Sequence, residues 1–227
     1  MNNLKLIITV LFSLALMVSP SVSKEFRIGA SVGFAQLEAS GSETLKDSSV
    51  ITTHTEQANA VVPSLFAELS ADNGFGIGID FIAGSADLAG SKRTRINTND
   101  GLANSGNDAN TNDANAEVDG IVTTYLIKSF DSGFLIKVGM ASADINTTET
   151  LGTGSTYGNK SVDGAHYGIG YDINRDSGTF VRTSLEHTDF DEISLKSGVA
   201  DAVTGTFNTV KADVDVTMLK LSIGKKF

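Results

Sequence analysis

A run of oxygen-bearing side chains, DANTNDANAEVD, has part of the spacing of a calcium-binding loop. Asp108, Asn110, Asn112 and Asp119 stand at its first, third, fifth and twelfth places, which are ligand positions in helix-flanked calcium loops. The sixth place holds Asp113 where such a loop needs glycine, the twelfth holds Asp in place of Glu, and no flanking helix is indicated. We therefore expect an Asn-rich, disordered outer loop and no metal site here.

Histidine and cysteine are the next candidates for chemistry. The chain has no cysteine, which excludes disulfides, thiolate metal sites and a thiol nucleophile. Of the histidines, His54 lies in a polar stretch, His166 on the polar face of a predicted strand, and His187 near the end of another. These positions indicate no catalytic group and no cofactor, so we do not expect an enzyme.

A basic cluster, Lys92, Arg93 and Arg95, follows the third predicted strand. Two interpretations stay open for it: contact with lipopolysaccharide phosphates, or ordinary charge at a membrane interface. The chain as a whole is acidic, with a formal net charge of -10. Because phosphate backbones require basic surface, nucleic acid is excluded as a partner.

The elements that would hold these residues are strands, because apolar side chains recur at every second position. Phe26, Ile28, Val32 and Phe34 alternate with small or charged residues, which is the period of a strand. The same alternation predicts eight strands, within 25–34, 61–70, 75–84, 118–130, 134–140, 165–173, 181–186 and 217–227. The facing of 118–130 stays open: one register points Ile121, Tyr125 and Ile127 outward, and the other Leu126 and Lys128.

Connections between the strands alternate between short and long. Turns that end in Gly74, Gly133 and Gly178 supply the positive-φ glycine of tight hairpins. Longer polar stretches at about 43–57, 94–116, 151–162 and 192–208 are expected to be four loops at the other end. This order predicts an all-β fold, an eight-stranded antiparallel up-and-down barrel.

The polar face of the strands is predicted to line the interior of this barrel. It is rich in glycine and carries equal numbers of both charges, namely Arg27, Lys137, Arg182 and Lys220 against Glu68, Asp80, Asp172 and Glu186. A buried interior has to pair its charges. The apolar face has phenylalanines near strand ends, and Phe26 and Phe34 are separated by roughly 20 Å of height, close to the apolar band of a membrane barrel. The apolar face is therefore predicted to contact lipid.

With these features the chain resembles the eight-stranded outer-membrane barrels of the OmpA/OmpX type. In that family the final strand ends in an aromatic residue after alternating apolar residues, here Leu219, Leu221, Ile223 and Phe227. The resemblance implies that these residues form an assembly signal read by the barrel-assembly machinery. It also implies periplasmic chaperones, outer-membrane lipid and lipopolysaccharide as partners, and a monomer. The His-x-Ser pair of lipid A deacylase barrels is absent at His54, His166 and His187.

The first 23 residues are predicted to be a secretory signal peptide, because Lys5 precedes an apolar run from Leu6 to Val18 and small residues follow at Ser21 and Ser23. The barrel domain is then 24–227, exported to the outer membrane of a Gram-negative bacterium. The expected function is envelope structure or surface interaction through four extracellular loops. A narrow gated channel is the alternative, and a lipid-modifying enzyme is the third class.

Overall fold

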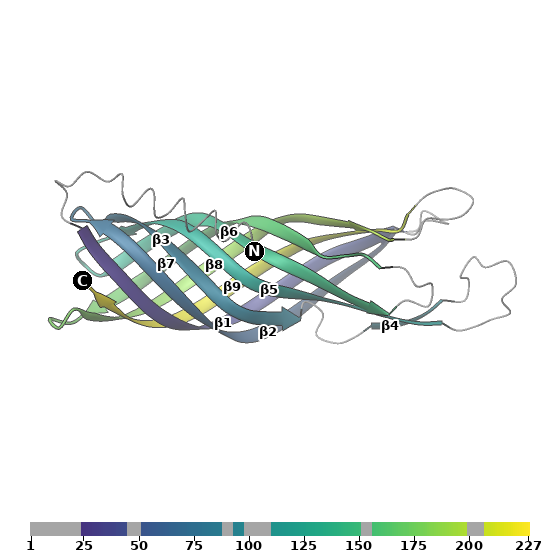
Figure 1. Ribbon diagram of the computed structural model, residues 1–227, viewed down its shortest axis with the longest axis horizontal. Helices are drawn as coiled ribbons and strands as arrows, with labels where there is room; N and C mark the ends of the chain where they lie inside the picture. The colour runs from purple at the N-terminus through teal and green to yellow at the C-terminus, as the bar shows by residue number, and fades with distance from the viewer. Residues whose placement is uncertain (1–23, 45–50, 88–92, 98–109, 151–155, 199–206) are drawn as a thin grey trace, which may run out of the picture.

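The computed structural model describes residues 24–44, 51–87, 93–97, 110–150, 156–198 and 207–227 (Figure 1). The predicted signal peptide, residues 1–23, lies outside these ranges. The described part of the chain is all β, and its strands are β1 (Lys24–Thr44), β2 (Ile51–Ala71), β3 (Phe75–Asp87), β4 (Arg93–Asn97), β5 (Asn110–Ser129), β6 (Phe134–Thr150), β7 (Lys160–Asn174), β8 (Thr179–Lys196) and β9 (Thr209–Lys226).

The strands form one closed antiparallel sheet. Its order is β3-β2-β1-β9-β8-β7-β6-β5-β4, and β3 also pairs with β5. Because β3 and β4 pair with successive parts of β5, they occupy one place in the wall, and the barrel has eight. The predicted fold class is confirmed. Among the described residues no helix is long and apolar enough to cross a membrane.

Tight turns join the strands at one end of the barrel, as the sequence predicts. Gly74, Gly133 and Gly178 have φ angles of 77°, 92° and 79°, a region that side chains with a Cβ rarely enter. The first and last strands close the barrel at this end. Phe26 and Phe227 exchange both backbone hydrogen bonds, at 3.1 and 2.8 Å, and their rings lie 6.2 Å apart.

At the other end the sequence predicts four loops that are longer than the connections in the structure. The predicted loop boundaries are wrong, because the strands extend into these stretches. β1 and β2 pair from Lys24–Ala71 up to Thr44–Ile51, so most of 43–57 is strand. β4 and the first residues of β5 occupy much of 94–116, β7 begins within 151–162, and β8 extends into 192–208. The strand residues here are small or polar on both faces, as at Thr55 and Glu56, and such sequence resembles a loop.

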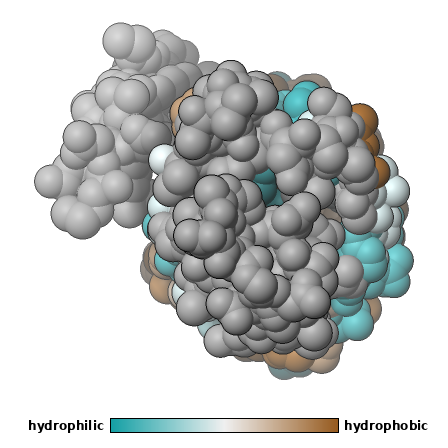
Figure 2. Space-filling view, turned by 90° about the vertical axis from the view of Figure 1, so that its right-hand side faces the viewer, coloured by the Kyte–Doolittle hydropathy of each residue, from teal (hydrophilic) through white to brown (hydrophobic). Residues whose placement is uncertain are grey.

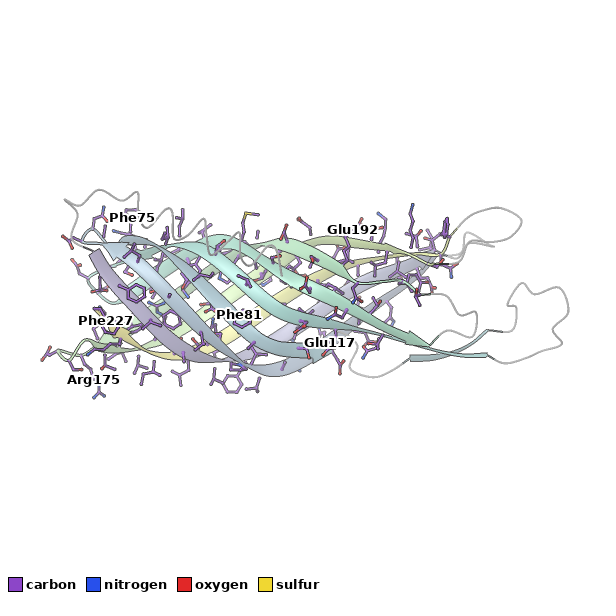
Figure 3. All side chains as sticks on the ribbon, in the orientation of Figure 1. Phe75, Phe81, Glu117, Arg175, Glu192 and Phe227 are labelled. Atoms are coloured by element: carbon purple, nitrogen blue, oxygen red, sulfur yellow. The ribbon has the colours of Figure 1, made fainter. Side chains whose placement is uncertain are left out.

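The wall changes character along its length. On β1, Val32 and Phe34 point outward and are 46% and 58% exposed, whereas the next residues, Ala35 and Leu37, point inward and are buried. Glu38 then points outward. Near the tight turns the barrel is thus apolar outside and polar inside, and toward the long connections it is polar outside and apolar inside. Figure 3 shows Phe75 and Phe227 at the first end and Glu117 and Glu192 in the other half.

The apolar interior of the far half is a conventional hydrophobic core. All eight wall positions contribute to it, with Ala35, Leu37, Val62, Ile82, Val118, Ile121, Ala141, Ala143, Ile145, Val162, Phe190, Ile193, Val214, Val216 and Met218. Figure 2 looks onto this end and shows both hydrophilic and hydrophobic residues around the circumference. Burial of these side chains stabilises the half of the barrel whose outer wall is polar.

The facing of 118–130 is settled by the structure. Tyr125 and Ile127 are buried inside the barrel, at 4% and 1% exposure, and Ile121 also points inward. Leu126 points outward, and Lys128 reaches the outward ring of Phe75. Of the two registers that the sequence leaves open, the second is therefore correct.

Candidate functional site: the filled barrel interior

The interior near the tight turns is organised around Arg182 of β8. Its Nε donates to Asp172 Oδ1 at 2.7 Å, and its Nη1 and Nη2 donate to Glu68 Oε1 and Oε2 at 2.5 and 3.0 Å. Arg27 donates to the other oxygen of Asp172 at 2.8 Å, and the Tyr125 hydroxyl donates to Glu68 at 2.8 Å. Every polar atom of the central guanidinium thus has a partner, as burial of a charge requires.

Aromatic rings enclose this cluster. The Arg182 guanidinium carbon lies 5.3 Å from the centre of the Phe66 ring and 5.4 Å from that of Phe180, within cation–π range. Glycines make room for the rings: a Cβ on Gly29 would lie 2.4 Å from Phe66 Cζ, and one on Gly224 the same distance from Phe180 Cζ. The glycines of the polar face therefore serve close packing of the interior.

A second cluster lies next to the first and carries the remaining charges. Lys137 donates to Glu186 Oε1 at 2.8 Å. Lys220 donates to Asp80 and lies 3.5 Å from Glu186 Oε2. His166 completes the cluster, with Nδ1 2.9 Å from the Thr188 hydroxyl and Nε2 3.9 Å from Glu186.

The structure brings together all eight charged residues that the sequence assigned to the interior. Each is at most 6% exposed, and each has an ion-pair partner of opposite sign among the eight, Arg27, Glu68, Asp80, Lys137, Asp172, Arg182, Glu186 and Lys220. Sequence reasoning did not include Tyr125 and His166 in this network. Their inward position follows from the register of β5 and β7, which alternation alone does not fix for β5.

Little open space remains inside the barrel. The cavity between the second cluster and the apolar core, beside His166 and Lys220, has a volume of about 10 Å³. A second cavity in the apolar core is about 20 Å³. Each has room for about one water molecule, so among the described residues the interior around these two cavities is closely packed.

The wall itself is interrupted between β2 and β3. In the described residues their pairing ends at Ser64–Ile82, although β2 continues to Ile51 alongside β1. Pro63, which lacks an N–H to donate, stands at the end of the paired part. β3 bulges here, with a register shift between Ile82 and Ser85 and a φ of 104° at Gly84. The 20 Å³ cavity lies against this seam, with Ala60 and Val62 on one side and Gly84 and Ala86 on the other.

Comparison with known proteins supports the architecture. No protein-family model matches the chain, and the search of curated protein sequences finds no match. Among solved structures, the outer membrane protein OprG from Pseudomonas aeruginosa aligns with a TM-score of 0.60 and 14% identity over 91% of this chain and 97% of that one. The outer membrane protease OmpT from Escherichia coli aligns with a TM-score of 0.52 and 8% identity over 92% and 99%.

This chain has the fold of the eight-stranded outer-membrane barrels. At these identities the likeness concerns the fold alone, and the protease activity in the second name belongs to that protein. The resemblance read from the sequence is confirmed at the level of architecture.

The remaining candidate residues of this outer-membrane-type barrel lie apart from the charge network. His54 Nε2 contacts Glu56 Oε1 at 2.5 Å, and His187 Nδ1 contacts the Thr217 hydroxyl at 2.9 Å. Within the described ranges no group of three or more His, Cys, Asp or Glu residues could hold a metal ion.

The stretch with calcium-loop spacing is extended. Asp108 lies outside the described residues, and Asn110, Asn112, Asp113 and Asp119 belong to β5. The expectation of a disordered loop is wrong for 110–119, since this part pairs with β4 and β6.

The basic cluster and the final strand have the following positions. Lys92 lies outside the described residues, and Arg93 and Arg95 are on β4, opposite Ala114 and Asn112. On β9 the outward row that the resemblance marks as an assembly signal is exposed, with Leu219, Leu221, Ile223 and Phe227 between 53% and 71%. Lipopolysaccharide contact and the assembly signal stay predictions.

Proposed function

We propose that the protein is an integral barrel of a Gram-negative outer membrane, exported by its signal peptide, with a lumen closed to ions and a polar outer half that serves envelope structure or surface interaction. The observation that carries this proposal is the reversal of polarity along the wall, together with the paired charges that fill the interior. A barrel with a continuous apolar band on its outer wall is stable in lipid, whereas in water it aggregates. The long connections lie at the end with the polar outer wall, which we assign to the cell surface.

Fractionation and conductance test the two parts of this proposal. The protein should be recovered from the outer membrane and should migrate differently on a gel before and after heating, because the folded barrel resists detergent. In a planar bilayer it should give no steady openings. Recovery from the aqueous fraction without detergent would contradict the membrane location, and frequent, steady openings would contradict the closed lumen. If openings occur and disappear on Glu68→Gln or Arg182→Gln, the gate lies in the charge network.

The second candidate function is passage of small solutes, and the interrupted β2–β3 seam favours it. Between β2 and β3 the wall has no backbone pairing beyond Ser64–Ile82, on the side away from the tight turns. Together with the apolar core and the cavity against the seam, this gap suggests a path through the wall for a small apolar molecule. Uptake of such a solute into vesicles that contain the protein tests this. Ala60→Trp, which fills the cavity, should abolish uptake, whereas Ala30→Trp on the outward face should not. Uptake no faster than in protein-free vesicles would exclude this function.

A further inference from the structure

A shallow apolar groove of about 440 Å³ lies on the outward face of the barrel, toward the tight turns. Two rows of side chains cross three neighbouring strands there. Ile77, Leu126 and Val138 form one row, and Phe75, Lys128 and Ile136 form the row nearer the turns. The volume is within the range of about 300–1,000 Å³ that small-molecule sites occupy. Apart from Lys128, the side chains of both rows are apolar, so the groove fits a hydrocarbon chain.

One end of this groove has a fixed positive charge. The Lys128 ammonium lies 4.4 Å from the centre of the Phe75 ring and 5.4 Å from that of Phe130, and it donates to the backbone carbonyl of Asn73. None of these contacts carries a negative charge. A lysine ammonium has three donors, so donors remain for an anion that approaches from the membrane side. Phe75 and Phe130 also restrict where the ammonium can lie.

We propose that this groove binds one acyl chain of an anionic phospholipid of the periplasmic leaflet, with the lipid phosphate on Lys128. This inference rests on the membrane location proposed above. In that location the tight turns lie on the periplasmic side, as in other outer-membrane barrels. The row of Ile77, Leu126 and Val138 is therefore at acyl-chain depth, and the Lys128 ammonium is at headgroup depth. A neutral apolar partner would leave the lysine without a counter-charge, whereas an anionic phospholipid complements both the groove and the ammonium.

Lys225 offers a matched control. It is also on the outward face at the tight-turn end, it donates to the backbone carbonyl of Ser177, and it is paired with Ile28 and Thr179 on the neighbouring strands. It does not line the groove. If surface lysines attract anionic lipid in general, both Lys128 and Lys225 should contribute to lipid binding. If the proposed site binds the lipid, only Lys128 should contribute.

Native mass spectrometry of the full barrel tests the proposal, with phosphatidylglycerol as the probe and phosphatidylcholine as the zwitterionic comparison. We expect one retained phosphatidylglycerol per barrel, and apparent affinity at least tenfold lower for Lys128→Ala but unchanged for Lys225→Ala. Val138→Trp, which fills the groove and keeps the lysine, should also lose the lipid. Equal loss of phosphatidylglycerol affinity in Lys128→Ala and Lys225→Ala would overturn the site. Equal retention of phosphatidylglycerol and phosphatidylcholine would also overturn it, as would a dimer whose interface excludes lipid from the groove.

Heat-modifiable migration of the same samples reports separately on the barrel. If every variant is folded and inserts into vesicles, equal lipid retention overturns only the lipid site, and the membrane location stands. Failure of the unaltered protein to insert would contradict the proposed function itself.

Discussion

Arg182 is the residue on which the interior most depends, since it binds both Glu68 and Asp172. Its replacement by alanine would leave two buried carboxylates with fewer partners, and breaking a buried pair typically costs about 3–5 kcal/mol. We expect Arg182→Ala to lower the free energy of unfolding by about this amount, measured by urea titration of the barrel in micelles. Arg175→Ala, at an exposed position in a turn, should change it by less than about 0.5 kcal/mol. Equal effects of the two variants would contradict the role of the network.

On the outer wall of the far half, Asp215 lies between two other carboxylates. It is opposite Asp189 on β8 and Glu38 on β1. Partial burial, and then the Asp189 charge, raise the pKa of Asp215 above its ordinary value, while His187, 3.9 Å away, acts in the opposite direction. A carboxyl whose pKa is higher in the folded than in the unfolded state favours folding below the unfolded pKa, and this contribution is lost as the pH rises through the folded pKa.

Removal of this charge should therefore stabilise the barrel at neutral pH. Like charges that face each other across strands cost roughly 0.2–1 kcal/mol, so we expect Asp215→Asn to raise the free energy of unfolding by about this amount at pH 7 and by less when the carboxyls are protonated. Urea titration at both pH values measures it. Asp163→Asn, opposite Ser142, is the control. A gain that does not depend on pH would argue against charge as the cause.

Among the elements, the tight turns combine positive-φ glycines with close packing. Gly133 has positive φ, its carbonyl accepts from Asp172 N at 2.8 Å, and a Cβ there would lie 2.5 Å from Asp172 O. Gly158 also has positive φ, but nothing lies within 4 Å of its Cβ position. Gly158→Ala should cost about 1–2 kcal/mol from backbone strain alone, and Gly133→Ala clearly more, by urea titration. If the two variants lose the same free energy of unfolding, the close contact with Asp172 O is relieved by a shift that costs no stability.

The last strand gives a second prediction at this scale. Phe227 and Phe75 are both outward phenylalanines at the tight-turn end, at 71% and 60% exposure, but only Phe227 belongs to the proposed assembly signal. Phe227→Ala should reduce the fraction of heat-modifiable barrel in the outer membrane severalfold, and Phe75→Ala should reduce it little. If the two variants assemble alike, Phe227 acts only as one aromatic residue of the membrane interface.

Much of this element structure could be predicted because its causes are local. Alternation marks the strands, and glycine after Asp and a polar residue marks the turns. The facing of Leu126 and Lys128 could not be settled, because both faces of this part of β5 carry apolar residues, Ile121, Tyr125 and Ile127 on one and Val122 and Leu126 on the other. The seam beside Pro63 depends on pairing between β2 and β3, a property of two strands that no single stretch contains.

For the whole molecule, the reversal of polarity is the feature that sequence reasoning missed. A signal for it exists: on β1 the apolar positions change from even to odd numbers between Phe34 and Ala35. The predicted strand ends at Phe34, just before this change, and the residues between it and the expected loop at about 43–57 are assigned to neither element. The interior charges could be assigned from the sequence because equal numbers of both signs on one strand face indicate a buried face. Which charge pairs with which depends on the stagger of all the strands, and the sequence does not give that stagger.

Cysteine labelling tests the reversal directly, since the chain has no cysteine of its own. Val32 and Glu38 are outward positions on β1, below and above the reversal. In vesicles Glu38→Cys should react with a water-soluble maleimide at least tenfold faster than Val32→Cys, because thiolate formation requires water. After unfolding in hot detergent the two rates should be alike. Rapid labelling of Val32→Cys in the folded barrel would place water where we place lipid.

The reversal also fixes the depth at which the molecule is immersed. A shift inward would move the carboxylates of Glu38, Asp189 and Asp215 into hydrocarbon, and a shift outward would move Phe34 and Leu219 into water. Both displacements are unfavourable, so there is one depth at which each ring of the outer wall matches its surroundings. A bilayer that is thinner or thicker than the apolar band would then have to adapt to the protein, and the barrel would act as a gauge of local membrane thickness.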